Sequence, residues 1–153
     1  MEFRRLTADD APLLVEATGK ETGRALWDSQ PAGPYTLADA EAALSRWTDE
    51  DQSFGVFENN RLVAATGLMP DGDGSAELAY WVRPECRGRG VAVAALRHLT
   101  DWAHDNGHTR TWLEIRPDNK ASQRVAERAG YTYERRIPNH CESHDCLIWT
   151  HYP

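Results

Sequence analysis

Apolar residues along this chain recur with two spacings, one typical of strands and one typical of helices. Short apolar or alternating runs predict strands at Glu2 to Leu6, Ser53 to Glu58, Arg61 to Met69, Glu77 to Val82, Arg110 to Arg116, Tyr131 to Arg136 and Cys146 to His151. Apolar residues three and four apart predict helices from about Ala11 to Thr18, from Thr36 to about Trp47, from about Arg89 to Asn106 and from Asp118 to Ala129. This order of elements predicts an α/β (α+β) fold in which helices cover both faces of a mixed sheet.

Length and composition favour a single domain, residues 1–153, since 153 residues that are 41% hydrophobic can bury one sizeable core. No apolar run approaches the roughly 20 residues that a membrane helix requires. The strand-like start, Met1 to Leu6, shows no signal peptide, so we expect a cytoplasmic protein with no membrane partner. The three cysteines, Cys86, Cys141 and Cys146, lack a disulfide-framework spacing, which is typical of a reducing compartment.

Charge is divided unevenly between the two halves of the chain. Residues 1–75 carry 14 acidic and 6 basic side chains, a net charge of −8, whereas residues 76–153 carry 10 acidic and 11 basic side chains, a net charge of +1. The second half therefore suits a polyanionic ligand, and the acidic half would attract a cationic one. A nucleic-acid partner fits this distribution poorly.

The most informative segment is the loop Arg87-Gly88-Arg89-Gly90-Val91-Ala92, which follows a predicted strand and opens a long predicted helix. Two glycines let backbone N–H groups converge on a phosphate, and the helix dipole adds partial positive charge there. The segment lacks the Gly-Lys-Ser/Thr ending of nucleotide triphosphatase loops and the three-glycine spacing of dinucleotide-binding loops. We interpret it as a pyrophosphate-binding loop of another kind.

Arg87, Gly90 and Ala92 fit the pattern Arg/Gln-x-x-Gly-x-Gly/Ala, which resembles the acetyl-CoA signature of the GNAT family of N-acetyltransferases. Further segments have the order and spacing of the RimJ/RimL-like ribosomal-protein branch of that family: Glu77 to Val82, Trp112 to Ser122, Glu127 to Tyr131, and His144-Asp145. The resemblance covers roughly Ser75 to the C-terminus. It implies the GNAT fold, a mixed, mostly antiparallel central sheet of about seven strands with helices on both faces. It also implies acetyl-CoA as co-substrate.

The resemblance further implies which residues bind acetyl-CoA. These are Trp81, Val82, Arg83, Arg87, Gly88, Arg89, Gly90, Val91, Ala92, Asn119, Ser122 and Arg128. It also implies a strand that splays from its neighbour and exposes amides to the pantetheine arm and thioester. We therefore expect the oxyanion donor to be a main-chain N–H near Trp81 or Val82.

Acetyl transfer to an amine requires a base, because a free alkylamine titrates near ~10.4 and is protonated at neutral pH. Glu114 is the first candidate, since similar chains carry a catalytic Glu in this Leu-Glu-x-Arg context; alternatively, it pairs with Arg110 or Arg116 on the surface. Glu77 is the second candidate, as a base or as an amine-binding group, against an ordinary carboxylate at a strand end.

The departing thiolate requires a proton. Many relatives supply it from a Tyr on the last helix, but that position here is Ala126. The RimL-type pattern of Asn119 and Ser122 offers the hydroxyl of Ser122 instead, unless this serine only satisfies a backbone group in the first turn. Asn119 could hydrogen-bond the pantetheine arm, cap the helix, or do both.

The expected acceptor is a primary amine, either a protein N-terminus or a small cationic molecule, and the expected assembly is a monomer or a homodimer. Trp27 and Tyr35 either wall the acceptor pocket or pack in the core.

An acetyl-cysteine at Cys86 is disfavoured because the sequence places no His partner beside it. His140 to Cys146 has the residue types of a zinc site, but no ligand pair stands at a structural Cys-x-x-Cys spacing, so we expect no metal. Direct attack in a ternary complex is therefore favoured, and Ala126 motivates the alternative of a catalytically degenerate acyl-CoA-binding sensor.

Overall fold

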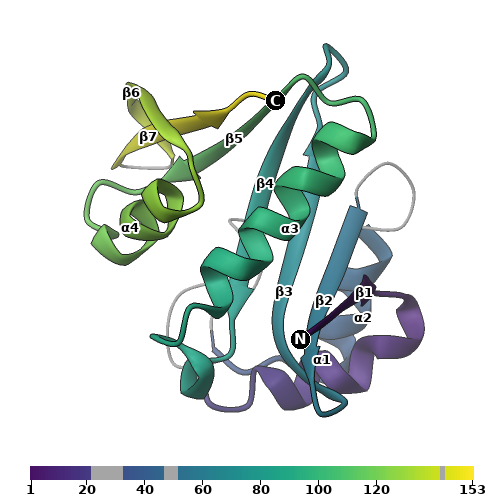
Figure 1. The fold of residues 1–153 in the computed structure, drawn as a ribbon. Helices are drawn as coiled ribbons and strands as arrows, with labels where there is room; N and C mark the ends of the chain where they lie inside the picture. The colour runs from purple at the N-terminus through teal and green to yellow at the C-terminus, as the bar shows by residue number, and fades with distance from the viewer. Residues whose placement is uncertain (22–32, 47–51, 142–143) are drawn as a thin grey trace.

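The computed structural model describes residues 1–21, 33–46, 52–141 and 144–153 (Figure 1). Within these residues, seven strands form one sheet in the order β1-β2-β3-β4-β5-β7-β6. The strands are β1 (Glu2–Arg5), β2 (Gln52–Glu58), β3 (Arg61–Pro70), β4 (Ser75–Val82), β5 (Arg110–Ile115), β6 (Thr132–Cys141) and β7 (His144–His151). The helices are α1 (Ala11–Ala17), α2 (Leu37–Arg46), α3 (Val91–Asp105) and α4 (Lys120–Arg128), with 3-10 turns η1 (Ala8–Asp10) and η2 (Pro84–Cys86).

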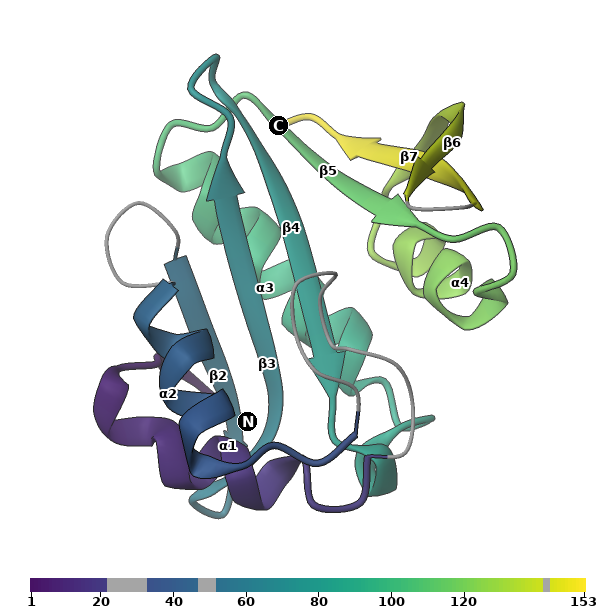
Figure 2. The ribbon, with the colours of Figure 1, turned by 180° about the vertical axis from the view of Figure 1, so that it is seen from behind.

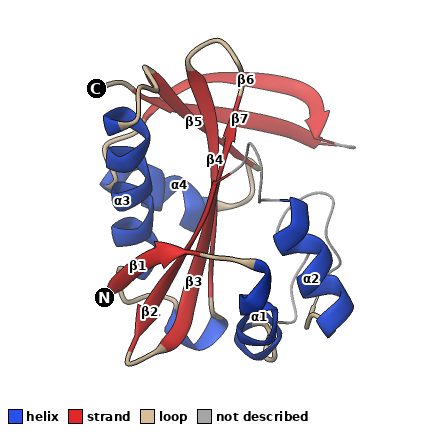
Figure 3. Cartoon of the chain, turned by 90° about the vertical axis from the view of Figure 1, so that its right-hand side faces the viewer, coloured by secondary structure: helices blue, strands red, loops and turns tan. Residues whose placement is uncertain are grey.

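The sheet is mixed and mostly antiparallel, as the sequence predicts, because β4 and β5 form its parallel pair while the other neighbours are antiparallel. Helices α3 and α4 lie on one face of the sheet, and α1 and α2 lie on the other (Figure 3). None of the helices in the described part of the chain is long and apolar enough to span a bilayer.

Each face of the sheet has its own apolar core. Leu96 and Leu99 of α3 pack with Leu78 of β4 and Leu113 of β5 on the α3/α4 face. On the α1/α2 face, a second cluster includes Leu14, Leu44, Phe57, Leu62 and Trp81. Helices cover both faces of β4, so its successive side chains pack alternately in the α3/α4 core and the α1/α2 core.

The β2–β3 hairpin joins the two strands that the sequence predicts at Ser53 to Glu58 and Arg61 to Met69. Asn59 and Asn60 both have positive φ, 51° and 63°, between the paired residues Glu58 and Arg61. Asparagine tolerates this conformation better than most residues do, and two such residues match the twist of the flanking strands.

The β6–β7 hairpin is longer than the sequence predicts. The sequence predicts strands that end at Arg136 and begin again at Cys146, but β6 continues to Cys141 and β7 begins at His144. Asp145 joins the extension, since its carboxylate accepts from Arg136 Nε at 2.6 Å and from the Asn139 N–H at 3.1 Å. Because β6 is an edge strand with a mostly exposed polar sequence, no apolar alternation marks this part of it.

Candidate active site

Strands β4 and β5 diverge soon after they pair, and the gap between them collects most of the predicted functional residues. Three residue pairs join the two strands: Ser75–Arg110, Ala76–Thr111 and Glu77–Trp112. Beyond these pairs β4 follows β3 while β5 follows β7, so the strands splay apart (Figure 2). A groove of about 950 Å³ runs along the splay, lined by the rest of β4 and β5, the loop before α3, the first turn of α3 and α4.

The backbone of β4 exposes N–H groups to this groove. Arg83 N–H donates to Val63 O at 2.8 Å, and Asp71 N–H donates to Ser75 O at 2.9 Å. The register between β3 and β4 is continuous, so the odd-numbered residues of β4 direct their backbone groups to β3. The even-numbered residues, among them Tyr80 and Val82, direct theirs into the splay. The N–H groups of Tyr80 and Val82 therefore face the groove, whereas that of Trp81 faces β3.

The loop before α3 has the geometry of an anion-binding site. Gly88 and Gly90 have φ of 77° and 82°, and a Cβ at either would meet no heavy atom within 4 Å, so the space before them is open. Gly90 is the N-cap of α3, and Ala94 N–H makes a bond to Gly90 O at 3.1 Å. The N–H groups that precede Ala94 in α3 therefore have no carbonyl acceptor within the helix, and their residues, Val91, Ala92 and Val93, line the groove.

Glu21 holds Arg87 at the end of the groove. Its Oε2 accepts from Arg87 Nη2 at 2.6 Å and from Trp81 Nε1 at 2.7 Å. Arg87 Nε also donates to Val82 O at 2.9 Å, so the guanidinium joins the loop to the end of β4. Glu21 is 5% exposed and lines the groove, a role that the sequence gave no reason to assign to it.

The two candidate bases lie on the same face of the sheet. Leu113 belongs to the core beneath α3 and α4, so its neighbour Glu114 projects from the opposite face of β5. Glu77 shares a face of β4 with Trp81, which packs in the α1/α2 core. Both glutamates are partly buried and line the groove. One carboxylate on each diverging strand thus faces the side where α1 and α2 lie.

Ser122 is hydrogen-bonded to a residue that the sequence did not single out. Its Oγ lies 2.7 Å from Tyr80 Oη, across the groove from β4 to α4. Burial raises the pKa of the Tyr80 phenol, so the phenol keeps its proton. Ser122 N–H also donates to Asn119 Oδ1 at 3.1 Å, so Asn119 caps α4. Ala126, one helical turn after Ser122, is fully buried in the core.

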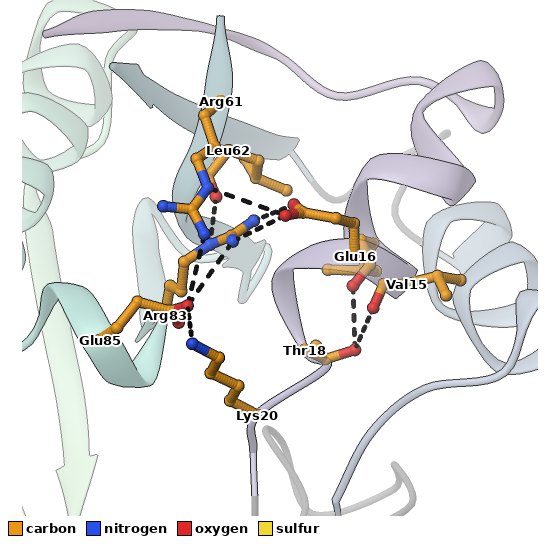
Figure 4. A network of polar contacts seen from close by, with 9 residues as sticks. Val15, Glu16, Thr18, Lys20, Arg61, Leu62, Arg83 and Glu85 are labelled. Carbon is orange, nitrogen blue, oxygen red and sulfur yellow. Dashed lines mark hydrogen bonds and ion pairs between the residues drawn. The ribbon is translucent and has the colours of Figure 1, made fainter. Parts of the chain in front are cut away.

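Arg83 lies beside the groove loop but does not face the groove. Its guanidinium is 1% exposed, donates from Nε to Leu62 O at 2.9 Å, and bonds the carboxylate of Glu16 with both terminal nitrogens (Figure 4). The hydrogen bond from Arg83 holds the pKa of Glu16 below its usual value. The Arg83 N–H is bonded to Val63 O, so the backbone joins the end of β4 to β3 while the side chain holds α1 against the sheet.

Two other predicted residues that the structure describes do not line the groove. Arg89 points to Glu58, with its Nη2 at 3.6 Å from Glu58 Oε1. Tyr35 is 3% exposed in the α1/α2 core. Trp27 lies outside the described residues. The remaining predicted acetyl-CoA residues, namely Trp81, Val82, Arg87, Gly88, Gly90, Val91, Ala92, Asn119, Ser122 and Arg128, all line it.

Residues that the sequence did not nominate also reach the groove, among them Arg116, Arg124 and His144. The arginines make its α4 side positively charged, as a polyphosphate ligand requires. Among the described residues, no group of three or more His, Cys, Asp and Glu side chains could hold a metal ion. Cys146 is disulfide-bonded, contrary to the absence of a disulfide framework that the cysteine spacing predicts.

A splayed parallel pair, a glycine loop at a helix start and exposed strand amides define an acyl-CoA-binding acyltransferase. The chain belongs to the GNAT family of N-acetyltransferases, since the sequence profile of the acetyltransferase (GNAT) domain matches residues 1–132. A streptothricin acetyltransferase from Streptomyces lavendulae is 28% identical over 96 residues, which are 55% of this chain and 51% of that enzyme. This chain thus matches about half the length of that relative.

Solved structures share the whole fold at low identity. A ribosomal-protein-alanine N-acetyltransferase from Brucella melitensis superposes with a TM-score of 0.82 at 18% identity and covers 100% of both chains. RimL, a ribosomal L7/L12 alpha-N-protein acetyltransferase in complex with coenzyme A, gives a TM-score of 0.81 at 17% identity, over 98% of this chain and 92% of that one. The predicted RimJ/RimL-like fold is confirmed by these neighbours.

Proposed function

We propose that this chain transfers the acetyl group of acetyl-CoA to a primary amine by direct attack within a ternary complex. The observation that carries the proposal is the arrangement of the groove. The phosphate-binding loop and Ser122 border it on the α3/α4 side, while Glu77 and Glu114 border it on the α1/α2 side. Acetyl-CoA and the amine can therefore approach one gap from opposite faces of the sheet and occupy it together.

Glu114 is the proposed base. It takes the proton from the protonated amine, directly or through a water molecule, so that the nitrogen lone pair becomes available to attack the thioester carbon. Glu77 is proposed to bind the same amine or a second positive charge on it. This division suits two carboxylates that project from different strands toward one space.

Backbone amides are proposed to stabilise the oxyanion. As the carbon–nitrogen bond forms, negative charge develops on the former carbonyl oxygen, and fixed N–H donors stabilise that charge more than they stabilise the substrate. The N–H groups of Tyr80 and Val82 face the splay and meet this requirement. When the carbon–sulfur bond breaks, its electron pair goes to sulfur, and Ser122 donates the proton that yields the free thiol of CoA.

The acceptor is proposed to be a small cationic amine or a protein N-terminus. The carboxylates on the α1/α2 side and the net charge of −8 in residues 1–75 both favour a cation. One relative is named for streptothricin and two structural neighbours are named for ribosomal proteins, so both classes of acceptor belong in the test.

A catalytically degenerate acyl-CoA sensor remains the second candidate, because Ala126 occupies the position where many relatives carry the acidic Tyr. The test is to incubate the protein with acetyl-CoA and a panel of diamines, amino sugars and peptides with free N-termini, and to follow the release of the CoA thiol. We expect release with at least one amine and an N-acetylated product by mass spectrometry. Acetyl-CoA binding by calorimetry without thiol release from any amine would favour the sensor instead.

A further inference from the structure

Tyr80 and Ser122 form a hydrogen bond across the groove. Tyr80 comes from β4 and Ser122 from the first turn of α4, and their oxygens are 2.7 Å apart, the usual separation for two hydroxyl groups. Both residues line the groove between the diverging strands. The contact therefore connects the strand that carries the exposed amides with the helix that carries the proposed acid.

Hydrogen counting limits what this contact can do. Each hydroxyl has one hydrogen and two lone pairs, and only one hydrogen can lie between the two oxygens. A phenol is the more acidic of the two groups, and burial keeps the Tyr80 phenol protonated, so Tyr80 is the natural donor. Ser122 Oγ then accepts this bond, and its own hydrogen points elsewhere.

The backbone of Ser122 is fixed independently of this bond. Its N–H donates to Asn119 Oδ1, which holds the start of α4 in place. Tyr80 is the partner that the described residues give Ser122 Oγ, and Ser122 lines the groove, so its hydrogen is available to a group bound there.

We infer that Tyr80 is a positioning residue that orients the Ser122 hydroxyl toward the departing sulfur, an inference that rests on the proposed function. As the carbon–sulfur bond breaks, the Ser122 proton moves to sulfur and forms the S–H bond of CoA. The hydrogen bond from Tyr80 stabilises the negative charge that develops on Ser122 Oγ during this transfer. Ser122 regains a proton from solvent in the open groove, so neither residue is changed by a turnover.

A second tyrosine provides a matched control for the loss of a phenol hydroxyl. Tyr131 is 4% exposed, and its Oη lies 2.7 Å from Thr100 Oγ1 and 2.8 Å from Thr111 Oγ1 in the core beneath α3. Tyr131→Phe therefore removes a hydrogen-bonded phenol that is more buried than Tyr80 and does not line the groove. It reports the structural cost of such a change without the positioning effect.

The experiment compares Tyr80→Phe, Ser122→Ala, the double variant and Tyr131→Phe. For each protein, kcat and the KM for acetyl-CoA are measured with the best amine of the panel, and CoA affinity is measured by calorimetry to establish that the groove is folded. We expect Tyr80→Phe to lower kcat roughly tenfold with CoA affinity unchanged, which is the size of a lost hydrogen bond to a charged group. Tyr131→Phe should keep kcat within about twofold.

The double variant separates positioning from packing. If Tyr80 acts through Ser122, adding Tyr80→Phe to Ser122→Ala should lower kcat no further. Full kcat in Tyr80→Phe, or losses that multiply in the double variant, would overturn the inference and leave the proposed function standing. A wild-type protein that acetylates no amine of the panel would overturn both.

Discussion

The carboxylate of Glu21 is buried against the guanidinium of Arg87, with 2.6 Å between Oε2 and Nη2. The two residues are unequally exposed, 6% for the Glu21 side chain and 50% for Arg87. The ion pair is therefore fixed by its buried acidic partner, and the exposed part of Arg87 remains at the mouth of the phosphate-binding loop. Glu21 thus fixes a cation at the end of the groove that we propose binds acetyl-CoA.

This asymmetry predicts the effect of removing the cation alone. Arg87→Met keeps the aliphatic stem but leaves Glu21 charged and buried, so we expect a loss of about 1–3 kcal/mol in the free energy of unfolding. Adding Glu21→Gln should recover part of that loss, because the buried charge that has lost its guanidinium partner is then removed. Urea unfolding without ligand measures both; a double variant that is no more stable than Arg87→Met would contradict the role of Glu21.

The loop glycine has a control elsewhere in the chain. Gly90→Val should weaken acetyl-CoA binding at least roughly tenfold, about 1.4 kcal/mol, because a branched side chain strains φ of 82° and projects into the phosphate space. Gly72, in the β3–β4 turn, has the same φ of 82° and open space around it, but it does not line the groove. Gly72→Val should therefore share the strain and keep the affinity. Equal affinities by calorimetry in wild type and Gly90→Val would refute the phosphate-binding assignment.

The two candidate bases differ in their expected kinetics. Glu114→Gln retains the shape and removes the basic carboxylate, so turnover should fall about 10²-fold while acetyl-CoA affinity stays nearly constant. Glu77→Gln should mainly raise the KM for a cationic amine, because it removes binding charge. Steady-state kinetics at saturating acetyl-CoA distinguishes the two roles, and a reversed pattern would exchange them.

The free energy of unfolding should depend on pH through a histidine pair formed by α3 and the last residue of β7. His104 Nε2 lies 2.9 Å from His151 Nδ1, and burial, followed by the charge of His104, lowers the pKa of His151. Below about pH 6.5 the unfolded chain therefore binds a proton that folded His151 resists, so the free energy of unfolding falls as pH decreases.

The pH effect can be isolated. Burial also lowers the pKa of His98, so His151→Gln should reduce the pH dependence and not abolish it. Urea unfolding between pH 7 and about pH 5.5 avoids the window where Glu16, whose pKa is lowered by Arg83, begins to titrate. An unchanged slope in His151→Gln would contradict the assignment.

The order of elements could be read from the sequence because each buried strand and each amphipathic helix has an apolar period. Exposed edges carry no such signal, which is why the extension of β6 beyond Arg136 was not predicted. The start of α3 was placed two residues early for a related reason. Gly90 adopts a positive φ as the N-cap, and periodicity does not report a backbone angle.

The site was predictable where it follows a contiguous motif and unpredictable where it depends on distant contacts. The glycine loop and the Asn119–Ser122 turn are local, and the structure brings both to the groove. Glu21 meets Trp81 across 60 positions and Tyr80 meets Ser122 across 42, so no spacing in the sequence relates them. Arg83 adjoins the motif by number, yet its side chain turns to Glu16.

Only three residue pairs join β4 to β5 among the described residues, so the sheet consists of two sets of strands with few hydrogen bonds between them. Strands β1 to β4 form one hydrogen-bonded ladder, and β5, β7 and β6 form another, with α3 packed across the seam. A ligand bound between these two sets of strands would contact both of them. Local unfolding of either set would then also break its contacts with the ligand and cost more free energy. Hydrogen exchange along β7, which does not border β4, should therefore slow when the groove is filled. The fold thus gives the ligand a part in holding the domain together.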